Sequence, residues 1–89
     1  MNIYRVNFNA KCPKNDSSIL YTLEIITTEM IEVECITDFT VQITAGFHET
    51  IADDLARQFG GKQRLVAFHH GVQILSLIHI SEPTRQAEI

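Results

Sequence analysis

At 89 residues the chain has room for one small domain, and its 45% hydrophobic and 20% charged content excludes an intrinsically disordered protein. The net charge of −4 at pH 7 argues against general nucleic-acid binding. No apolar run reaches the ~18 residues of a membrane span, and the first residues, MNIYRVNFNA, lack the apolar core of a signal peptide. We therefore expect a cytoplasmic protein without membrane contact, in the host cytoplasm if a phage encodes it.

The chain begins with two segments in which apolar and polar residues alternate, the pattern of half-buried strands. Residues 3–10 and 19–26 both show it, and the sequence CPKNDSS between them is rich in turn-forming residues. We therefore predict an antiparallel hairpin with a long loop. Arg5, Lys11 and Lys14 form a small basic cluster around this hairpin, and they are candidates for binding an acidic partner.

The next two segments also alternate, although the first of them allows a second interpretation. Apolar residues flank Glu32 and Glu34, which favours a strand over residues 30–36. Thr28, with the two residues after it, could instead open a short helix. Residues 39–44 alternate again and predict a fourth strand.

The strongest helical signal follows in residues 47–59. Phe47, Ile51, Leu55 and Phe59 recur every four residues and form a single apolar stripe. Two glycines directly after the stripe are typical of the end of a helix. We predict one amphipathic helix over this range.

The segment after the two glycines, residues 64–70, is short and apolar on both faces until a pair of histidines. This pattern is typical of a central strand. Because successive side chains of a strand point to opposite faces, we expect His69 and His70 on opposite sides of the sheet.

The predicted order of elements is β-β-β-β-α-β. It indicates an α+β domain, a mostly antiparallel sheet with one amphipathic helix packed on one face. Association into a homo-oligomer would help so small a core, and we expect it. Cys12 in the hairpin loop and Cys35 in the core are expected to be reduced thiols. The predicted core consists of Phe8, Tyr21, Leu23, Val33, Val41, Ile51, Leu55, Phe59, Leu65 and Ala67.

The last part of the chain resembles something other than a protein family. Residues 75–85 read LSLIHISEPTR, which matches, residue for residue, the translation of the transposase adapter used in sequencing-library preparation. Residues 86–89, QAEI, are what a sample index and the next adapter segment would encode. The resemblance implies that residues 1–74 form the native single domain, that residues 75–89 are a non-native tail, and that the natural sequence after Ile74 is not present.

Three histidines are the strongest candidates for a site. His48 lies in the first turn of the predicted helix, and His69 and His70 end the last strand. Their spacing with nearby carboxylates matches no zinc motif, so we predict no metal, no cofactor and no catalytic residue. An imidazole pair that titrates near neutrality is nevertheless the best candidate binding surface. The Gly60-Gly61-Lys62 sequence is not expected to bind phosphate, because it follows a helix instead of preceding one.

The lack of a catalytic or cofactor motif favours a small non-catalytic binding or inhibitor protein over an enzyme. Such proteins are common on phages and mobile elements, where they block host defence complexes or sequester signalling nucleotides. The expected partner is therefore a protein or a small nucleotide. A regulatory subunit of an unknown complex is an alternative.

The order of hairpin, helix and strand is also similar to half of a tunnelling fold, a family that handles pterins and purines. This resemblance implies a small enzyme in which hairpins and helices build oligomeric barrels with sites between subunits. The metal-binding histidines of the family's first strands have no counterpart here, because Asn7, Asn9 and Cys12 stand in their place.

Overall fold

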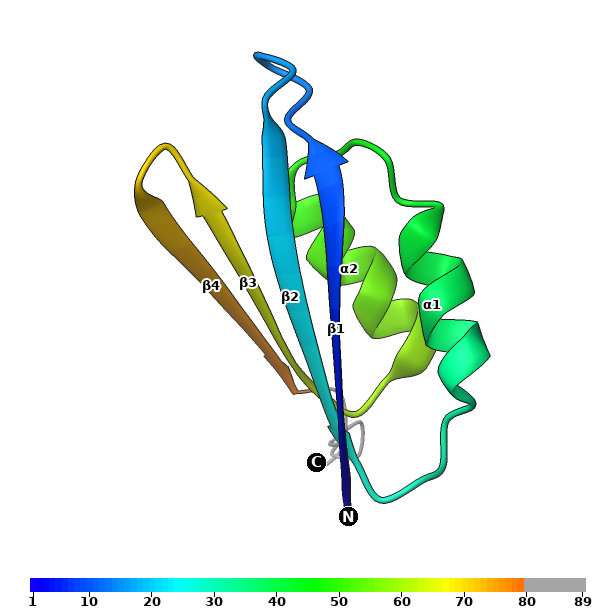
Figure 1. Cartoon of the computed structure of the whole chain (residues 1–89). Helices are drawn as coiled ribbons and strands as arrows, with labels where there is room; N and C mark the ends of the chain where they lie inside the picture. The colour runs from blue at the N-terminus through cyan, green and yellow to red at the C-terminus, as the bar shows by residue number, and fades with distance from the viewer. Residues whose placement is uncertain (80–89) are drawn as a thin grey trace.

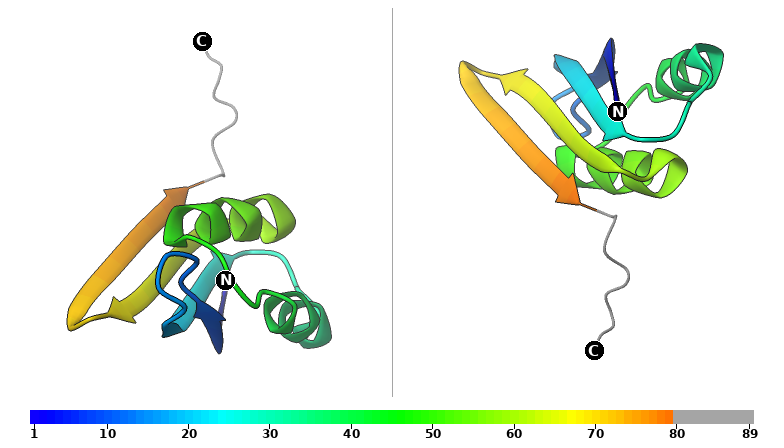
Figure 2. Two further views of the ribbon diagram at one scale, coloured as in Figure 1. Left: turned by 90° about the horizontal axis from the view of Figure 1, so that it is seen from above. Right: turned by 90° about the horizontal axis from the view of Figure 1, so that it is seen from below.

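The computed structural model describes residues 1–79. Four strands form one antiparallel sheet in sequence order, and two helices between the second and third strands cover one of its faces (Figure 1). Figure 2 shows this arrangement as two layers. The predicted α+β class is confirmed, but the predicted order is corrected to β-β-α-α-β-β. The elements are β1 (Asn2–Lys11), β2 (Ser18–Thr27), α1 (Val33–Val41), α2 (His48–Phe59), β3 (Lys62–His69) and β4 (Val72–His79).

The first hairpin forms as predicted, with β1 and β2 paired along their whole lengths. Phe8 and Tyr21 face each other across the pair on the helix-covered face, and their rings stack at 5.1 Å between centroids. On the opposite face Glu24 forms salt bridges with Arg5 of β1 and Arg64 of β3. One face of the hairpin therefore packs into the core, and the other faces solvent.

The two strands predicted between residues 30 and 44 are wrong, because α1 occupies this region. This segment also has residues at helical spacing. Ile36 and Thr40 lie four residues apart, and they are the buried residues of α1. The Thr40 hydroxyl donates to the Ile36 carbonyl oxygen at 2.9 Å, so its burial leaves no unpaired hydroxyl. Val33 and Val41, both predicted in the core, are instead 62% and 69% exposed.

The predicted amphipathic helix is confirmed as α2, with Ile51 and Leu55 buried on its apolar stripe. Gly60 ends it with a φ of 68°, a left-handed conformation that glycine adopts without steric cost. The buried Gln63 side chain then donates to the carbonyl oxygens of Leu55 at 3.0 Å and Gly60 at 2.8 Å. In this way β3 fastens the C-terminal end of the helix to the sheet.

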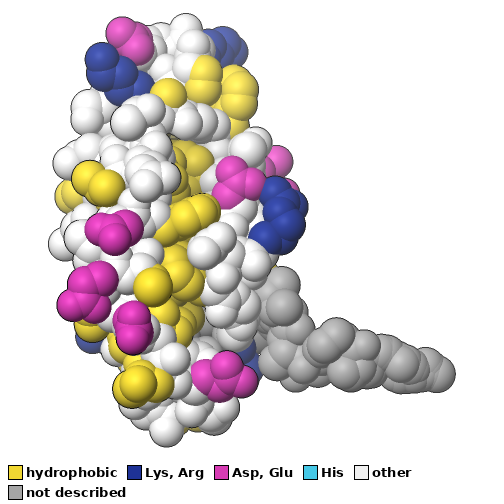
Figure 3. Space-filling view, turned by 90° about the vertical axis from the view of Figure 1, so that its right-hand side faces the viewer, with side chains coloured by type: hydrophobic (Ala, Val, Ile, Leu, Met, Phe, Trp, Pro, Cys, Tyr) yellow, Lys and Arg dark blue, Asp and Glu magenta, His cyan; other side chains and the backbone are white. Residues whose placement is uncertain are grey.

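The two helices meet through Phe39 and Phe59, whose rings pack edge to face at 5.5 Å. Figure 3 views the helix-bearing side, where hydrophobic side chains form a strip between acidic ones. Cys35 is exposed on α1, which corrects its predicted burial, whereas Cys12 is buried. Neither helix of residues 1–79 is long and apolar enough to cross a membrane. Besides the exposed Val33 and Val41, one residue of the predicted core, Phe59, is only partly buried. The other seven are buried as expected: Phe8, Tyr21, Leu23, Ile51, Leu55, Leu65 and Ala67.

The predicted central strand is confirmed as β3, which lies between β2 and β4. It ends at His69, and His70 and Gly71 form a tight turn with φ values of 53° and 79°. His70 has therefore left the strand, and the expected placement of the two histidines on opposite faces is corrected: their rings lie 4.3 Å apart.

The strand β4 includes residues 75–79 of the segment that resembles the adapter. These residues pair with β3, where Ser76 lies opposite Leu65. The remainder of that segment, residues 80–89, lies outside the described residues. The origin of the segment stays a prediction.

The connection between the helices determines where α2 begins. The Lys11 backbone N–H donates to the Thr44 carbonyl oxygen at 2.9 Å, and the Gly46 N–H donates to the Lys11 carbonyl oxygen at 3.1 Å. The two segments form a short parallel bridge at this point. As a result, the first turn of α2 lies beside the end of β1 and the start of the hairpin loop.

Candidate active site

A cavity of about 210 Å³ lies where the start of α2 meets the helix-covered face of the sheet. Four of its side chains carry reactive or titratable groups: Cys12 from the hairpin loop, Tyr21 from β2, His48 from α2 and His69 from β3. Segments that are distant in the sequence therefore contribute to one small volume. The remaining lining residues are Ile19, Gly46, Phe47, Ala67 and Ile74.

A second and larger cavity, of about 610 Å³, adjoins the first around the first turn of α2. Phe47, His48 and Ile74 line both cavities, so these residues form the wall between them. The larger cavity adds Glu49, Thr50 and Ser76 to the polar groups of the region. A volume of several hundred Å³ is in the range of small-molecule sites.

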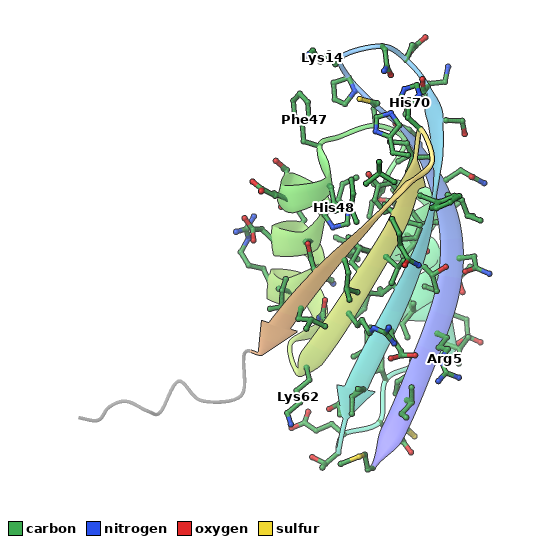
Figure 4. All side chains as sticks on the ribbon, turned by 90° about the vertical axis from the view of Figure 1, so that its left-hand side faces the viewer. Arg5, Lys14, Phe47, His48, Lys62 and His70 are labelled. Atoms are coloured by element: carbon green, nitrogen blue, oxygen red, sulfur yellow. The ribbon has the colours of Figure 1, made fainter. Side chains whose placement is uncertain are left out.

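His48 is the central residue of this region, and it lies between α2 and the strands β3 and β4 (Figure 4). Its Nε2 lies 2.7 Å from the Ser76 Oγ, and its ring stacks on Tyr21 with 5.7 Å between centroids. Its Nδ1 is buried and has no hydrogen-bond partner among residues 1–79. Burial lowers the pKa of His48, against an opposing effect of Glu49. The lowered pKa favours the neutral imidazole, and in the tautomer whose Nε2–H donates to Ser76 the Nδ1 atom can receive a hydrogen bond or a proton.

Cys12 was not predicted as a site residue, yet it is only 8% exposed and faces the same cavity as both imidazoles. Burial raises the pKa of Tyr21, and the proximity of Cys12 raises it further. A thiol near imidazoles is the combination from which nucleophilic sites are built. The sequence contained no local signal for this grouping, because it depends on the bridge between Lys11 and the connection before α2.

The histidine pair is divided between the cavity and the surface. His69 lines the smaller cavity, and its Nε2 is buried without a hydrogen-bond partner in the described part of the chain. His70 is exposed at the turn, where its Nε2 lies 3.2 Å from the Asn15 Nδ2 of the hairpin loop. Of the three predicted histidines, His48 and His69 therefore meet at one site.

The predicted basic residues do not form one cluster. Arg5 lies toward the opposite end of the sheet from Lys14 (Figure 4), and it is paired with Glu24. Lys11 lies 4.0 Å from Asp16 within the hairpin loop. Within residues 1–79, no group of three or more His, Cys, Asp or Glu side chains is arranged to hold a metal ion.

No family model matches the chain, and no curated protein matches it in sequence. A solved structure does match: a crystal structure of the archaeosine synthase QueF-Like in the apo form. It has a TM-score of 0.70 and 16% sequence identity, and the match covers 86% of this chain and 89% of that one. The chain has the fold of this synthase.

This likeness corrects the predicted function. The chain was expected to be a non-catalytic inhibitor, but almost its whole described structure follows the architecture of an enzyme. Among the interpretations drawn from the sequence, the likeness supports the enzyme alternative better than the inhibitor. The inhibitor hypothesis, with its phage and anti-defence context, is therefore withdrawn.

Proposed function

We propose that the chain is a subunit of a tunnelling-fold-like enzyme that acts on a purine or pterin in the cavities around His48. The observation that carries the proposal is the grouping of a thiol, a phenol and two imidazoles in one cavity of a fold shared with a synthase. The synthase is named for archaeosine, and the tunnelling-fold resemblance implies bicyclic nitrogen heterocycles. The structural likeness and the sequence resemblance therefore both support a purine or pterin as the substrate.

The larger cavity offers what a flat, polar ring requires. Phe47, 57% exposed at its mouth, provides an apolar surface for one face of such a ring. The Glu49 carboxylate in the first turn of α2 can accept hydrogen bonds from the N–H groups along a purine or pterin edge. In the proposed complex the ring lies against Phe47, with its N–H edge toward Glu49.

The reactive groups would then lie on the other side of His48. The free nitrogen of this imidazole can accept a proton from the substrate or from the Cys12 thiol, and the thiolate is the nucleophile in such pairs. We assign Glu49 to binding and His48 to proton transfer, with the Cys12 thiol as the nearby reactive group of the same cavity. In this role the His48 Nε2–H donates to the Ser76 Oγ, and the Nδ1 atom exchanges the proton.

A ligand screen with two variants tests this proposal. Thermal shift and calorimetry with soluble purine nucleosides and pterins should find at least one ligand for the parent chain. Glu49→Gln should weaken its affinity by roughly 10-fold or more, because a charge-assisted hydrogen bond is lost. Glu34→Gln, in the first turn of α1, is the matched control and should bind like the parent. An equal effect of both variants, or no ligand in the panel, would refute the proposal.

We also propose that a second copy of the chain completes the site. Phe47 at the cavity mouth is exposed, and the edge strands β1 and β4 each pair with one strand within residues 1–79, which leaves their outer edges open to another chain. Light scattering after size exclusion should give a mass above one chain. A monomer at the concentrations that bind ligand would contradict this part of the proposal.

A further inference from the structure

The hairpin loop and the β3–β4 turn meet at one end of the sheet, where Figure 4 places Lys14 and His70 close to the same edge. The contact between them is the Asn15 Nδ2 to His70 Nε2 hydrogen bond at 3.2 Å. It joins two segments that are distant in the sequence, and both residues are exposed. Neither side chain belongs to the lining of the cavities described above.

The direction of this hydrogen bond is fixed by a second one. The Ser17 backbone N–H donates to the Asn15 side chain at 3.1 Å, and a backbone N–H can only donate. The atom it meets must therefore be the Asn15 oxygen, so the atom facing His70 is the amide nitrogen, a donor. His70 Nε2 must accept, which requires a neutral imidazole with its proton on Nδ1.

The same two segments carry groups of the cavity. In the hairpin loop, the Cys12 N–H donates to the Ser17 carbonyl oxygen at 2.8 Å, and the Asp16 N–H donates to the Cys12 carbonyl oxygen at 2.7 Å. Asn15 is thus part of a short closed loop whose base is Cys12. On the other side, His70 directly follows His69, which lines the cavity.

We propose that the Asn15–His70 hydrogen bond is a pH-sensitive latch that controls access to the Cys12 thiol. With His70 neutral, the latch holds the hairpin loop against the β3–β4 turn and keeps Cys12 covered. When the imidazole takes up a proton, Nε2 becomes a donor that faces another donor, and the latch opens. Imidazoles change charge between about pH 8 and pH 5, so the latch responds in that range.

Other charged and titratable groups surround the latch. His69 adjoins His70 in the same turn, and its ring lies 4.3 Å away. The facing loop carries Lys14 together with the Lys11–Asp16 pair. Across the cavity, the start of α2 contributes His48 and Glu49. The donor-to-donor conflict between Asn15 and a protonated His70 determines that the latch opens on acidification.

The latch is tested by the reactivity of Cys12 without any ligand, so the result is independent of the proposed function. The exposed Cys35 is first replaced by Ser, and the rate of Cys12 modification by 4,4′-dithiodipyridine is measured at about pH 7.5 and about pH 5.5. His70→Gly removes the imidazole and suits the left-handed φ of 53°. At the higher pH this variant should react about 2- to 10-fold faster than the parent, and at the lower pH the two rates should converge.

A second variant separates the latch from simple loosening of the turn. Asn15→Asp preserves the acceptor for Ser17 N–H and presents a carboxylate oxygen to a protonated His70. Its latch should stay closed on acidification, so at about pH 5.5 Cys12 should react more slowly than in the parent. Asn9→Asp adds the same charge on an exposed position of β1 and should react like the parent.

Three outcomes overturn the proposal. The first is a His70→Gly variant that reacts at the parent's rate at both pH values. The second is an increase that persists unchanged at about pH 5.5, which would mean that the proton on His70 has no role. The third is an Asn15→Asp variant that reacts as the parent or as Asn9→Asp does at about pH 5.5. Circular dichroism of each variant confirms that the rates come from folded protein.

Discussion

The His48 imidazole is held 2.7 Å from the Ser76 hydroxyl across the cavity wall, which links the first turn of α2 to β4. Ser76 lies in the segment that resembles a sequencing adapter. If that prediction is correct, the His48–Ser76 hydrogen bond is specific to this chain.

Replacing Ser76 with Ala tests how far this contact matters. The change removes the hydrogen-bond partner of the His48 Nε2 atom, and the ring that carries this atom is half-buried. We therefore expect a loss of about 0.5–1.5 kcal/mol in the free energy of unfolding. Ligand affinity should fall only slightly, because Ser76 lines the larger cavity and holds His48 but is assigned no contact with the ligand. Denaturant unfolding and calorimetry measure both quantities. A loss of binding with the fold retained would show that Ser76 belongs to the site.

Truncation after Ile74 examines the origin of the tail more directly. The truncated chain loses the pairing of residues 75–79 with β3 and should therefore be less stable. If the tail is of adapter origin, ligand binding by the folded fraction should persist. Complete loss of binding in a protein that still folds would contradict the adapter interpretation.

The pH dependence of stability should reveal the buried imidazole. Burial lowers the pKa of His48 in the folded state, so at mildly acidic pH the unfolded chain binds more protons than the folded one. Stability contributed by the neutral His48 is therefore complete above the ordinary imidazole pKa of about 6.5 and declines as the pH falls below it. His48→Gln should flatten this decline between about pH 7 and pH 5. Thermal or denaturant unfolding at several pH values measures this decline. If the variant loses stability with falling pH as steeply as the parent, another group causes the decline.

The core can be checked with one matched pair of aliphatic residues. Leu55 is fully buried, and Leu55→Ala should reduce the free energy of unfolding by about 2–5 kcal/mol. Val33 was also predicted in the core but is exposed on α1, so Val33→Ala should change stability by no more than about 0.5 kcal/mol. Similar losses for the two variants would mean that α1 is packed differently.

The C-terminal end of α2 gives a further prediction. Gln63 donates two hydrogen bonds to carbonyl oxygens at that end, and Gln63→Leu would leave both acceptors without this donor. We expect a loss of about 1–3 kcal/mol in the free energy of unfolding. Gln42→Leu, at an exposed position after α1, is the control and should have little effect. Urea unfolding of both variants measures the two losses. Equal losses would mean that the Gln63 hydrogen bonds do not stabilise this end of α2.

The parts of the fold that were predictable are those in which local pattern and tertiary packing agree. The first hairpin and α2 each have one clear apolar face, so the period alone identifies them. Residues 30–44 were misread because the same apolar residues satisfy both an alternating and a helical spacing. Tertiary packing decides between the two, since Ile36 needs a place in the core against β1 and β2, and a helix provides it.

The site was only partly predictable for a related reason. His48 and His69 were noticed as residue types, but nothing local shows that they share a cavity. Cys12 was assigned to a loop, and its burial depends on long-range contacts such as the backbone bridge between Lys11 and Ala45. Contacts between segments this far apart in the sequence leave no periodic signal within either one.

The most direct test of the central claim is to observe the His48 ring while a ligand is added. Two-bond 1H–15N correlation spectra resolve the imidazole nitrogens, with His48→Gln and His70→Gly used for assignment. Addition of the purine or pterin that binds best should shift the His48 signals saturably and leave those of His70 nearly unchanged. If the whole panel leaves His48 unshifted, or if only His70 responds, the proposed site and function are wrong.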